Sequence, residues 1–315
     1  MANDHYVPQL YLRNFAIPSK PSHVYRYKRA QKTEAKPIRR VASSEDFDLL
    51  TRTDQTFKSD TIAEIIKSIE NKVAPLIQRL LREPSPTLSK QDKDCLCLFV
   101  AYLLNRVPAS RNYSINFFKA SKIIEAKFTA EKKNIFDTRM KDTGLSPEEL
   151  EEMRLKVIDF EKHFSIDMDQ EDKGDISLMT SFVGAQLANR ILNDKWITFL
   201  NNGSRKEFIT SDNPVVLSPD PTVPDKIPFL ACALVYLPLS PEKALLFVNH
   251  KPVKSVVNVK REWVEDANSR LIGYARDCLF SRTLDKDIHD EFQASKRGVD
   301  TLVLSRGGKE FLRID

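Results

Sequence analysis

The sequence has little glycine and lacks the glycine-rich motifs that many nucleotide-binding proteins use. Only eight of its 315 residues are glycine. Neither Gly-x-x-x-x-Gly-Lys-Ser/Thr nor Gly-x-Gly-x-x-Gly occurs, which excludes a P-loop and a dinucleotide-binding fingerprint. Gly-x-Ser-x-Gly and His-Glu-x-x-His are also absent, which excludes the nucleophile elbow of α/β-hydrolases and a common zinc-protease motif. The chain therefore carries none of these familiar catalytic signatures.

Cysteines are few, and long apolar runs are missing. The four cysteines are scattered, and the Cys95-x-Cys97 pair lacks the spacing of a zinc knuckle, so we expect buried, reduced thiols. The longest apolar run, 229–237, lies between two prolines and is far shorter than the roughly 18 residues of a membrane span. The first residues do not show the basic segment and apolar segment of a secretion signal. We expect a cytoplasmic protein that does not bind membranes.

Size and composition indicate a protein with a substantial core. With 41% hydrophobic residues, a chain of 315 residues can bury a full core. We expect residues 1–315 to form a single compact domain with a charged helical hairpin inserted at about 113–165. The segment pattern predicts an α+β fold that is predominantly helical. It should contain a small N-terminal β element and a mixed or antiparallel sheet of at least four strands in the C-terminal half.

The expected helices and strands follow from hydrophobic periodicity and capping residues. From residue 60, apolar residues recur at three- and four-residue steps, which predicts an amphipathic helix that Pro75 should kink. Ser89 with Asp92, and Ser146 with Glu149, predict further helix starts. The other expected elements are a strand at 24–29 with 47–50 as its partner, helices at 113–134, 147–164 and 259–275, and one sheet of strands at 196–200, 207–210, 232–237 and 244–249.

The opening segment, residues 5–15, concentrates side chains that can hold a ligand. It places a histidine, an amide, a phenol and a guanidinium close together in the sequence. His5 is a candidate general base or metal ligand because imidazole titrates near neutral pH. The candidate binding residues of the same segment are Gln9, Tyr11, Arg13 and Asn14.

A second cluster, Ser211-Asp212-Asn213-Pro214, follows a predicted strand. Side chains at a strand end can project into a cleft, which makes Asp212 a catalytic candidate and makes Ser211 and Asn213 binding candidates. The same residue types are typical of a turn whose side chains satisfy nearby backbone donors. The residue types alone favour the turn.

Three further polar residues lie within or beside predicted helices. Arg106 lies near a helix C-terminus, where a cation can either stabilise the helix dipole or face an anionic ligand. Arg111 follows five residues later, and a second arginine so close supports the alternative of an anionic ligand. Asn268 lies inside a predicted helix, where asparagine is a poor helix former, so a structural hydrogen bond is favoured over ligand contact.

Positive charge is concentrated at the N-terminus. Residues 1–40 contain nine lysines and arginines against two acidic residues, which gives them a net charge of +7, whereas the whole chain carries +5. Tyrosines and phenylalanines are interleaved with these cations, a mixture that suits backbone neutralisation and base stacking on nucleic acid. The segment 25–28 also alternates as an ordinary strand would, with one face in the core and the other in water.

Several of these segments together resemble a known family. The opening His-Tyr-Val-Pro-Gln-x-Tyr-Leu-Arg-Asn-Phe is similar to the start of the bacterial and phage-associated family called domain of unknown function 4238. The later segments that resemble its motifs, in the expected order, are 74–77, 106–108 followed by Arg111, 208–215, 238–241 and 268–280. Where the family usually reads Arg-Thr-Pro, this chain has valine at position 107, which argues against a hydroxyl function there.

The resemblance implies a prokaryotic defence context and suggests that His5 and Asp212, which belong to two motifs of the family, share one site. We expect a nuclease that hydrolyses phosphodiester bonds of RNA or DNA. His5 or a divalent metal, Mg²⁺ or Mn²⁺, would activate water, and Asp212 would orient it. The three arginines at 13, 106 and 111 would stabilise the charge on phosphate.

Two other hypotheses compete with the nuclease. In the first, the same residues recognise a nucleotide or nucleic acid as part of a regulatory protein and no bond is broken. In the second, the motifs determine the fold, with residues 8–12 anchoring the N-terminal arm. The sequence leaves open whether any cofactor is bound.

Overall fold

A computed structural model describes residues 3–45, 47, 61–167, 170–220, 230–231, 233–295, 302–306 and 309–314. The chain divides into two compact units. The larger unit contains residues 1–111 and 178–299, and the smaller unit contains residues 112–177 and 300–315. The fold class is α+β and predominantly helical, with small N-terminal strands and a mixed sheet in the C-terminal half, which confirms the prediction from sequence.

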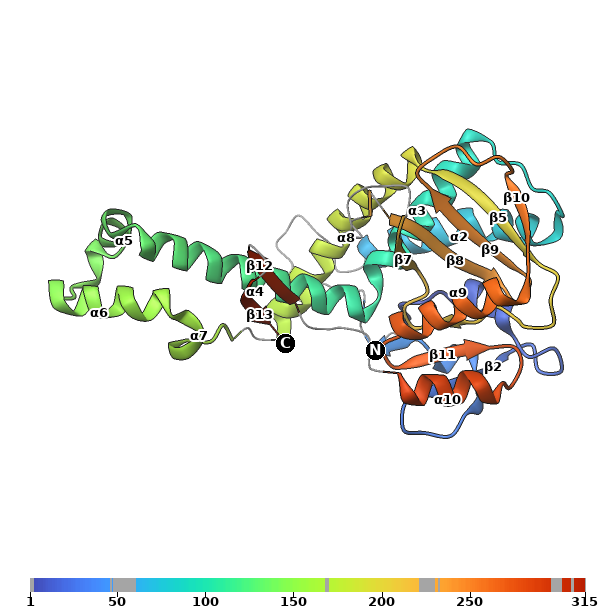
Figure 1. Cartoon of the computed structure of the whole chain (residues 1–315), viewed down its shortest axis with the longest axis horizontal. Helices are drawn as coiled ribbons and strands as arrows, with labels where there is room; N and C mark the ends of the chain where they lie inside the picture. The colour runs from blue at the N-terminus through green and yellow to red at the C-terminus, as the bar shows by residue number, and fades with distance from the viewer. Residues whose placement is uncertain are drawn as a thin grey trace. The chain divides into compact units, whose positions relative to one another are not determined.

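The main sheet of the larger unit has the strand order β10-β5-β9-β8-β7 among the described residues (Figure 1). All neighbours are antiparallel except β10 and β5, which are parallel. The strands are β5 (Trp196–Asn202), β7 (Val216–Pro219), β8 (Ala233–Ser240), β9 (Lys243–Val248) and β10 (Val256–Val259). Three of the four predicted strands, those near 196, 232 and 244, therefore lie in this sheet.

Both faces of this sheet are buried because alternate side chains of its strands enter different cores. Leu237 of β8 and Leu245 of β9 pack into one core with helices α2 (Thr61–Arg82) and α3 (Lys90–Arg106). Their neighbours Tyr236 and Ala244 enter a second core with helix α9 (Arg261–Tyr274). Since successive residues of a strand point to opposite faces, the apolar runs of β8 and β9 follow from burial on both sides.

A second, four-stranded antiparallel sheet has the order β3-β2-β11-β6. Its strands are β2 (His23–Lys28), β3 (Glu34–Pro37), β6 (Thr210–Ser211) and β11 (Cys278–Ser281). The predicted strand near 24–29 is confirmed, and it lies between β3 and β11. Of its expected partner segment, 47–50, all but Phe47 lies outside the described residues.

The expected strand at 207–210 was assigned to the wrong sheet. The strand β6 contains only two residues and pairs with β11 instead of the main sheet. The backbone N–H of Phe208 donates to the Pro241 carbonyl, which holds this segment at a loop before β6 begins. Periodicity alone detects that Phe208 and Ile209 are buried, but it does not indicate which sheet they join.

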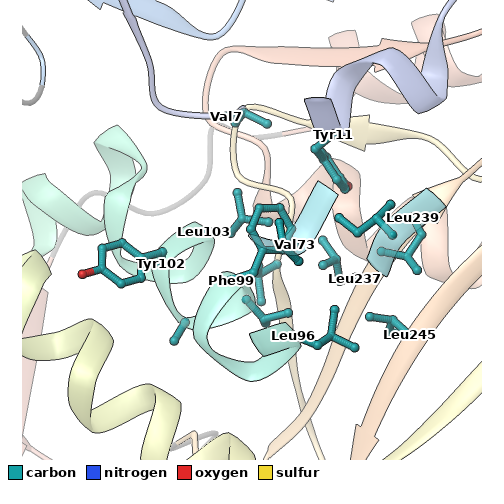
Figure 2. Packing of buried hydrophobic residues seen from close by; sticks show 14 of the residues in the cluster. Val7, Tyr11, Val73, Leu96, Phe99, Tyr102, Leu103, Leu237, Leu239 and Leu245 are labelled. Atoms are coloured by element: carbon teal, nitrogen blue, oxygen red, sulfur yellow. The ribbon is translucent and has the colours of Figure 1, made fainter. Parts of the chain in front are cut away.

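Short elements connect the N-terminus to these layers. The strand β1 (Asn3–His5) pairs antiparallel with β4 (Ser43–Glu45). Helix α1 (Gln9–Leu12) continues into the 3₁₀ helix η1 (Arg13–Phe15), and α1 packs against the 3₁₀ helix η2 (Ile38–Arg40). The N-terminal segment thereby reaches the first core, where Val7 and Tyr11 lie with residues of α2, α3, β8 and β9 (Figure 2).

The predicted helix starts are largely confirmed. Ser89 and Asp92 form a capping box at α3, and Ser146 and Glu149 form one at α6 (Pro147–Ile158). Helix α2 runs through Pro75 as one element. Helix α9 and the closing helix α10 (Lys286–Ala294) flank β11 in the sequence.

The smaller unit is mostly helical. Helix α4 (Pro108–Glu131) begins five residues earlier than predicted, with Pro108 at its first position, and α8 (Gln170–Asp194) begins near the end of this unit's first segment. Its other described elements are α5 (Lys133–Arg139), η3 (Lys141–Thr143), α6, α7 (Phe160–His163), β12 (Leu302–Arg306) and β13 (Lys309–Ile314). Ion pairs tie α4 to α7 and α5 to α6.

The cysteines are free thiols where they are described. Cys97 is buried, whereas Cys95 and Cys278 are half-buried. Cys232 lies outside the described residues. Burial raises the pKa of Cys97 to about 12 and that of Cys278 to about 12, so both thiols stay protonated at neutral pH.

Candidate functional site

The phenol of Tyr11 connects three of the sequence motifs. Its side chain is fully buried, and its hydroxyl lies 2.8 Å from Thr210 Oγ1 and donates to the Pro238 carbonyl at 2.7 Å. Burial strongly raises the pKa of Tyr11, so the hydroxyl keeps its proton. The contacts place Tyr11 in the core as an anchor for the N-terminal segment rather than on a surface that a ligand could reach.

Tyr6 lies where the N-terminal motif meets the end of β6. Burial raises the pKa of Tyr6, and the nearby charges of Asp212 and Asp277 raise it further. On another side, its ring lies 5.4 Å from the ring of Phe47, at an interplanar angle of 48°. His5 directly precedes Tyr6 and pairs with Ser43 between β1 and β4. Within the N-terminal motif, Tyr6 is therefore a residue that lies close enough to Asp212 for the carboxylate charge to act on it.

The carboxylate of Asp212 holds the backbone that follows α9. Its Oδ1 accepts from the N–H of Arg276 at 2.9 Å, and its Oδ2 accepts from Asp277 at 2.7 Å and Cys278 at 2.9 Å. Only 4% of the residue is exposed. Burial raises the pKa of Asp212 to about 6, although the three N–H donors act in the opposite direction. Both carboxylate oxygens therefore serve the backbone, as in the turn that the residue types favoured.

The neighbours of Asp212 also make structural hydrogen bonds. Ser211 is fully buried, and its Oγ accepts from the N–H of Asn213 at 3.1 Å. The Asn213 Nδ2 donates to the Tyr274 carbonyl at the end of α9, at 3.1 Å. Asn268, inside α9, accepts from the N–H of Ile209 at 3.2 Å and donates to the Glu207 carbonyl at 2.8 Å. The segments 207–213 and 268–278 are thus linked from both sides.

Arg106 and Arg111 lie close to the junction of α3 and α4 and are almost completely buried. They are 7% and 8% exposed, respectively. Arg106 pairs with Glu70 of α2, with 3.4 Å between Nη1 and Oε1. The Arg111 guanidinium lies over the Phe47 ring, 3.4 Å from its centroid, and donates to the Phe47 carbonyl. Both line one small cavity with Ile66, Tyr102, Leu178, Ser181 and Phe182.

The cavity beside Arg106 and Arg111 has room for about one water molecule, since its free volume is about 10 Å³. Tyr102 lines it from α3, and Figure 2 shows its hydroxyl pointing away from the other labelled core residues. In this form the two arginines cannot enclose a nucleotide.

The remaining N-terminal candidates lie nearer the surface. Gln9 is partly exposed at the start of α1, and Arg13 is exposed at the start of η1. The Asn14 Oδ1 accepts a hydrogen bond of 3.4 Å from Gln78 Nε2 of α2. Among these three, Arg13 is therefore the side chain best placed to meet a macromolecular ligand.

The basic N-terminal segment is divided between internal and exposed roles. Arg26 and Lys36 both pair with Glu34, at 2.5 Å and 3.0 Å. Arg29 donates to the carbonyls of Phe292 and Ser295 near the end of α10. Within residues 1–40, the exposed arginines that form no ion pair with any described residue are Arg13, Arg39 and Arg40.

Tyr25 and Tyr27 of β2 pack against or within the second core instead of offering a stacking platform. Tyr27 is fully buried, and its hydroxyl donates to the Thr283 carbonyl at 3.1 Å. The alternation of residues 25–28 is therefore that of a strand with its tyrosines turned toward the interior. Tyr27 is therefore not available for base stacking, and Tyr25 is only partly exposed.

The described residues contain no group of three or more His, Cys, Asp and Glu side chains arranged to hold a metal ion. A metal held by His5 and Asp212 would also compete with the backbone donors of the Asp212 carboxylate.

None of the helices in the described part of the chain is long and apolar enough to cross a membrane.

Sequence reasoning missed several residues of this region. Tyr6 joins the two main motifs, Glu70 pairs with Arg106, and Phe47 stacks under Arg111. Tyr6 could have been found because it lies within the N-terminal motif. Glu70 lies on a predicted amphipathic helix and Phe47 in a predicted strand, but neither pattern indicates an arginine partner, so their roles follow only from the fold.

The motif positions agree with a match to a known family. The sequence model described as a protein of unknown function (DUF4238) matches residues 3–285. No curated protein and no solved structure matches the chain. Because the match includes both the N-terminal segment and the interlocked segments around Asp212 and Asn268, the chain belongs to the DUF4238 family.

Proposed function

We propose that the protein is a nucleic-acid-binding protein that contacts the phosphate backbone through its N-terminal arginines. The observation that carries this proposal is the exposure of Arg13 on η1, which continues from α1, and of Arg39 and Arg40 on η2, which contacts α1. These residues form no ion pair with any part of the chain that the structure describes. Cations that are not neutralised by the protein itself can replace the counterions of a nucleic acid, which is the main source of non-specific affinity.

The packing of α1 on η2 supports a shared surface for these arginines. Arg13 directly follows α1, and Arg39 and Arg40 end η2. Tyr11 anchors α1 in the core through the Thr210 and Pro238 contacts. The anchored helix holds Arg13 at a fixed distance from η2, so less flexibility is lost when a ligand binds.

The contacts of Asp212 favour recognition over catalysis. A catalytic carboxylate must exchange a proton with water or substrate, or hold a metal. Both oxygens of Asp212 instead accept hydrogen bonds from backbone N–H groups. We therefore assign Asp212 a structural role in this proposal and do not include it in a catalytic pair with His5.

Hydrolysis of the bound nucleic acid is the second candidate. It is supported by the position of Tyr6, which is close to the charges of Asp212 and Asp277 and follows His5 in the chain. An imidazole at this place would act as the general base that activates water. Mg²⁺ or Mn²⁺ from solution would have to be coordinated by the substrate phosphates together with protein oxygens. The defence context and a cytoplasmic location belong to this proposal as well.

One experiment separates the two candidates. Purified wild-type protein and His5→Ala are incubated with labelled transfer RNA, single-stranded RNA, single-stranded DNA and duplex DNA, each with EDTA or with Mg²⁺ and Mn²⁺. Binding and cleavage are followed together. The matched control is His163→Ala, which removes an exposed histidine from α7.

The proposal predicts that all three proteins bind at least one of the nucleic acids and that none cleaves it. Cleavage by wild type and His163→Ala, but not by His5→Ala, would establish the nuclease instead. If no nucleic acid binds at low salt, the proposed function is wrong in both forms.

A further inference from the structure

The helices of the smaller unit form a cavity that is open to solvent and that the sequence did not suggest. Its volume is about 400 Å³, which lies within the range of roughly 300–1,000 Å³ found for small-molecule sites. The residues that line it are Lys122, Glu125, Ala126, Thr129, Phe136, Arg139, Met140, Met153, Val157, Phe160 and Phe164. The charged hairpin predicted for this region therefore has an apolar interior.

The cavity has a deep apolar part and an exposed mouth. Phe136 and Thr129 are its buried lining residues, at 4% and 7% exposed, whereas Phe164 is 36% exposed. Two methionines, Met140 and Met153, contribute flexible side chains that adapt to ligands of different shape. An apolar chain that entered from the mouth would be surrounded by aromatic and aliphatic groups.

Polar contacts hold the helices around this cavity. Lys127 of α4 pairs with Glu161 of α7 at 2.6 Å, and Lys133 of α5 pairs with Glu151 of α6 at 2.8 Å. Arg154 of α6 donates to the Ala130 carbonyl of α4 at 2.9 Å. These contacts join the helices through residues that do not line the cavity, so the helices are held together without a bound ligand.

The mouth of the cavity carries an excess of positive charge. Lys122 and Arg139 both line it, and they share one carboxylate, that of Glu125. The distances are 3.5 Å from Lys122 Nζ to Oε2 and 3.3 Å from Arg139 Nη1 to Oε1. The hydrogen bond from Arg139 and the charge of Lys122 lower the pKa of Glu125, which keeps this carboxylate ionised. Two cations facing one anion leave a net positive charge for an anionic head group.

We propose that this cavity binds a single-chain amphiphile with an anionic head group, a medium- or long-chain carboxylate. The alkyl chain fills the space between Phe136, Met153 and Phe160, and the carboxylate lies at Lys122 and Arg139. Burial of the chain supplies the affinity, and the two cations select the charged head group. This site is independent of the nucleic-acid proposal, because its lining residues lie entirely within 122–164.

Calorimetric titration of the full-length protein with decanoate, decan-1-ol and acetate tests this inference. Ala126→Trp fills the cavity, and Val157→Phe fills it from another helix in case the first variant does not fold, as judged by circular dichroism. Lys122→Gln combined with Arg139→Gln removes the head-group charge. Lys156→Gln, a lysine of α6 that does not line the cavity, is the matched control.

Decanoate is expected to bind wild type and Lys156→Gln at one site, and acetate is not expected to bind. Each folded cavity-filling variant should bind at least about tenfold more weakly, a loss of about 1.4 kcal/mol. The double charge variant should lose several-fold affinity for decanoate but not for decan-1-ol.

The proposal is overturned if decanoate does not bind saturably, or if a folded cavity-filling variant binds as wild type does. Equal binding of decanoate and decan-1-ol would contradict the role of Lys122 and Arg139. Vesicles of anionic phospholipid serve as a separate probe. If wild type and the cavity-filling variants bind these vesicles equally while decanoate does not bind, the protein interacts with a membrane surface and the proposed site is wrong.

Discussion

The Tyr11 hydroxyl lies 2.8 Å from Thr210 Oγ1, although 199 positions separate the two residues in the chain. The same hydroxyl donates to the carbonyl of Pro238, so one buried phenol joins α1, β6 and β8. Each of these segments contains a motif that resembles the DUF4238 family. The hydrogen bonds of Tyr11 therefore give these three motifs a role in stabilising the fold that does not depend on a ligand.

Tyr11→Phe should destabilise the protein by about 1–3 kcal/mol, because the Pro238 carbonyl and the Thr210 hydroxyl lose a buried partner. The measurement is urea-induced unfolding followed by circular dichroism. Tyr113→Phe is the control, since Tyr113 is 53% exposed, and its effect should stay within about 0.5 kcal/mol. Equal unfolding free energies for the two variants would show that the Tyr11 hydroxyl does not stabilise the fold.

Asp212→Asn should also weaken the fold at neutral pH, by about 1–3 kcal/mol. The amide NH₂ of asparagine would face backbone N–H groups that now donate to the carboxylate, those of Arg276, Asp277 and Cys278. Asp290→Asn on the exposed side of α10 is the comparison. If both variants unfold at the wild-type urea concentration, the three hydrogen bonds do not contribute.

The stability difference between wild type and Asp212→Asn should depend on pH. The folded pKa of Asp212 is raised from 3.8 to about 6, so between these values the folded state holds more protons than the unfolded state. The unfolding free energy contributed by Asp212 is therefore largest below pH 4 and decreases as the pH rises to 6, by up to roughly 3 kcal/mol. Urea titrations at pH 4, 5, 6 and 7 measure this difference. An advantage of wild type that grows with pH would mean that the N–H donors outweigh burial.

Arg29→Gln should destabilise the closing segment of the larger unit. The guanidinium donates to the carbonyls of Phe292 and Ser295 near the end of α10 and to that of Arg276 after α9. It also lies over the Phe292 ring, 4.3 Å from the centroid. Loss of hydrogen bonds from a charged donor should cost about 1.5–3 kcal/mol. Hydrogen exchange should become faster in α10, whereas exposed Lys32→Gln should leave it unchanged.

Local features of the fold could be predicted where the sequence contains its own boundary signals. The capping boxes at Ser89 and Ser146 and the strand near Val24 were found from residue types alone. The two-sided burial of β8 and β9 follows from their continuous apolar runs. The pairing of β6 with β11 could not be predicted, because a two-residue strand has no periodicity and its partner lies in another part of the chain.

The candidate site was only partly predictable. The motifs drew attention to Asp212, Asn213 and Asn268 as catalytic or binding candidates, but the sequence cannot distinguish a carboxylate that faces a ligand from one that faces backbone N–H groups. For Asp212 that distinction depends on where residues 276–278 lie in space. The cavity of the smaller unit could not be predicted, because its lining residues are interspersed with charged residues along each helix.

The salt dependence of nucleic-acid binding tests the proposed function most directly. Binding of single-stranded RNA is measured between low and physiological salt for wild type, for Arg13→Gln with Arg39→Gln and Arg40→Gln, and for a control triple variant. The control removes equal charge at exposed lysines elsewhere, through Lys141→Gln, Lys254→Gln and Lys286→Gln.

Each lost phosphate contact should reduce the slope of log K against log salt by about 0.7 on a single strand, so the arginine variant should lose roughly 2 in slope. The lysine variant should keep nearly the wild-type slope. If the two triple variants bind alike, Arg13, Arg39 and Arg40 are not the binding surface, and the proposed function loses the observation that supports it.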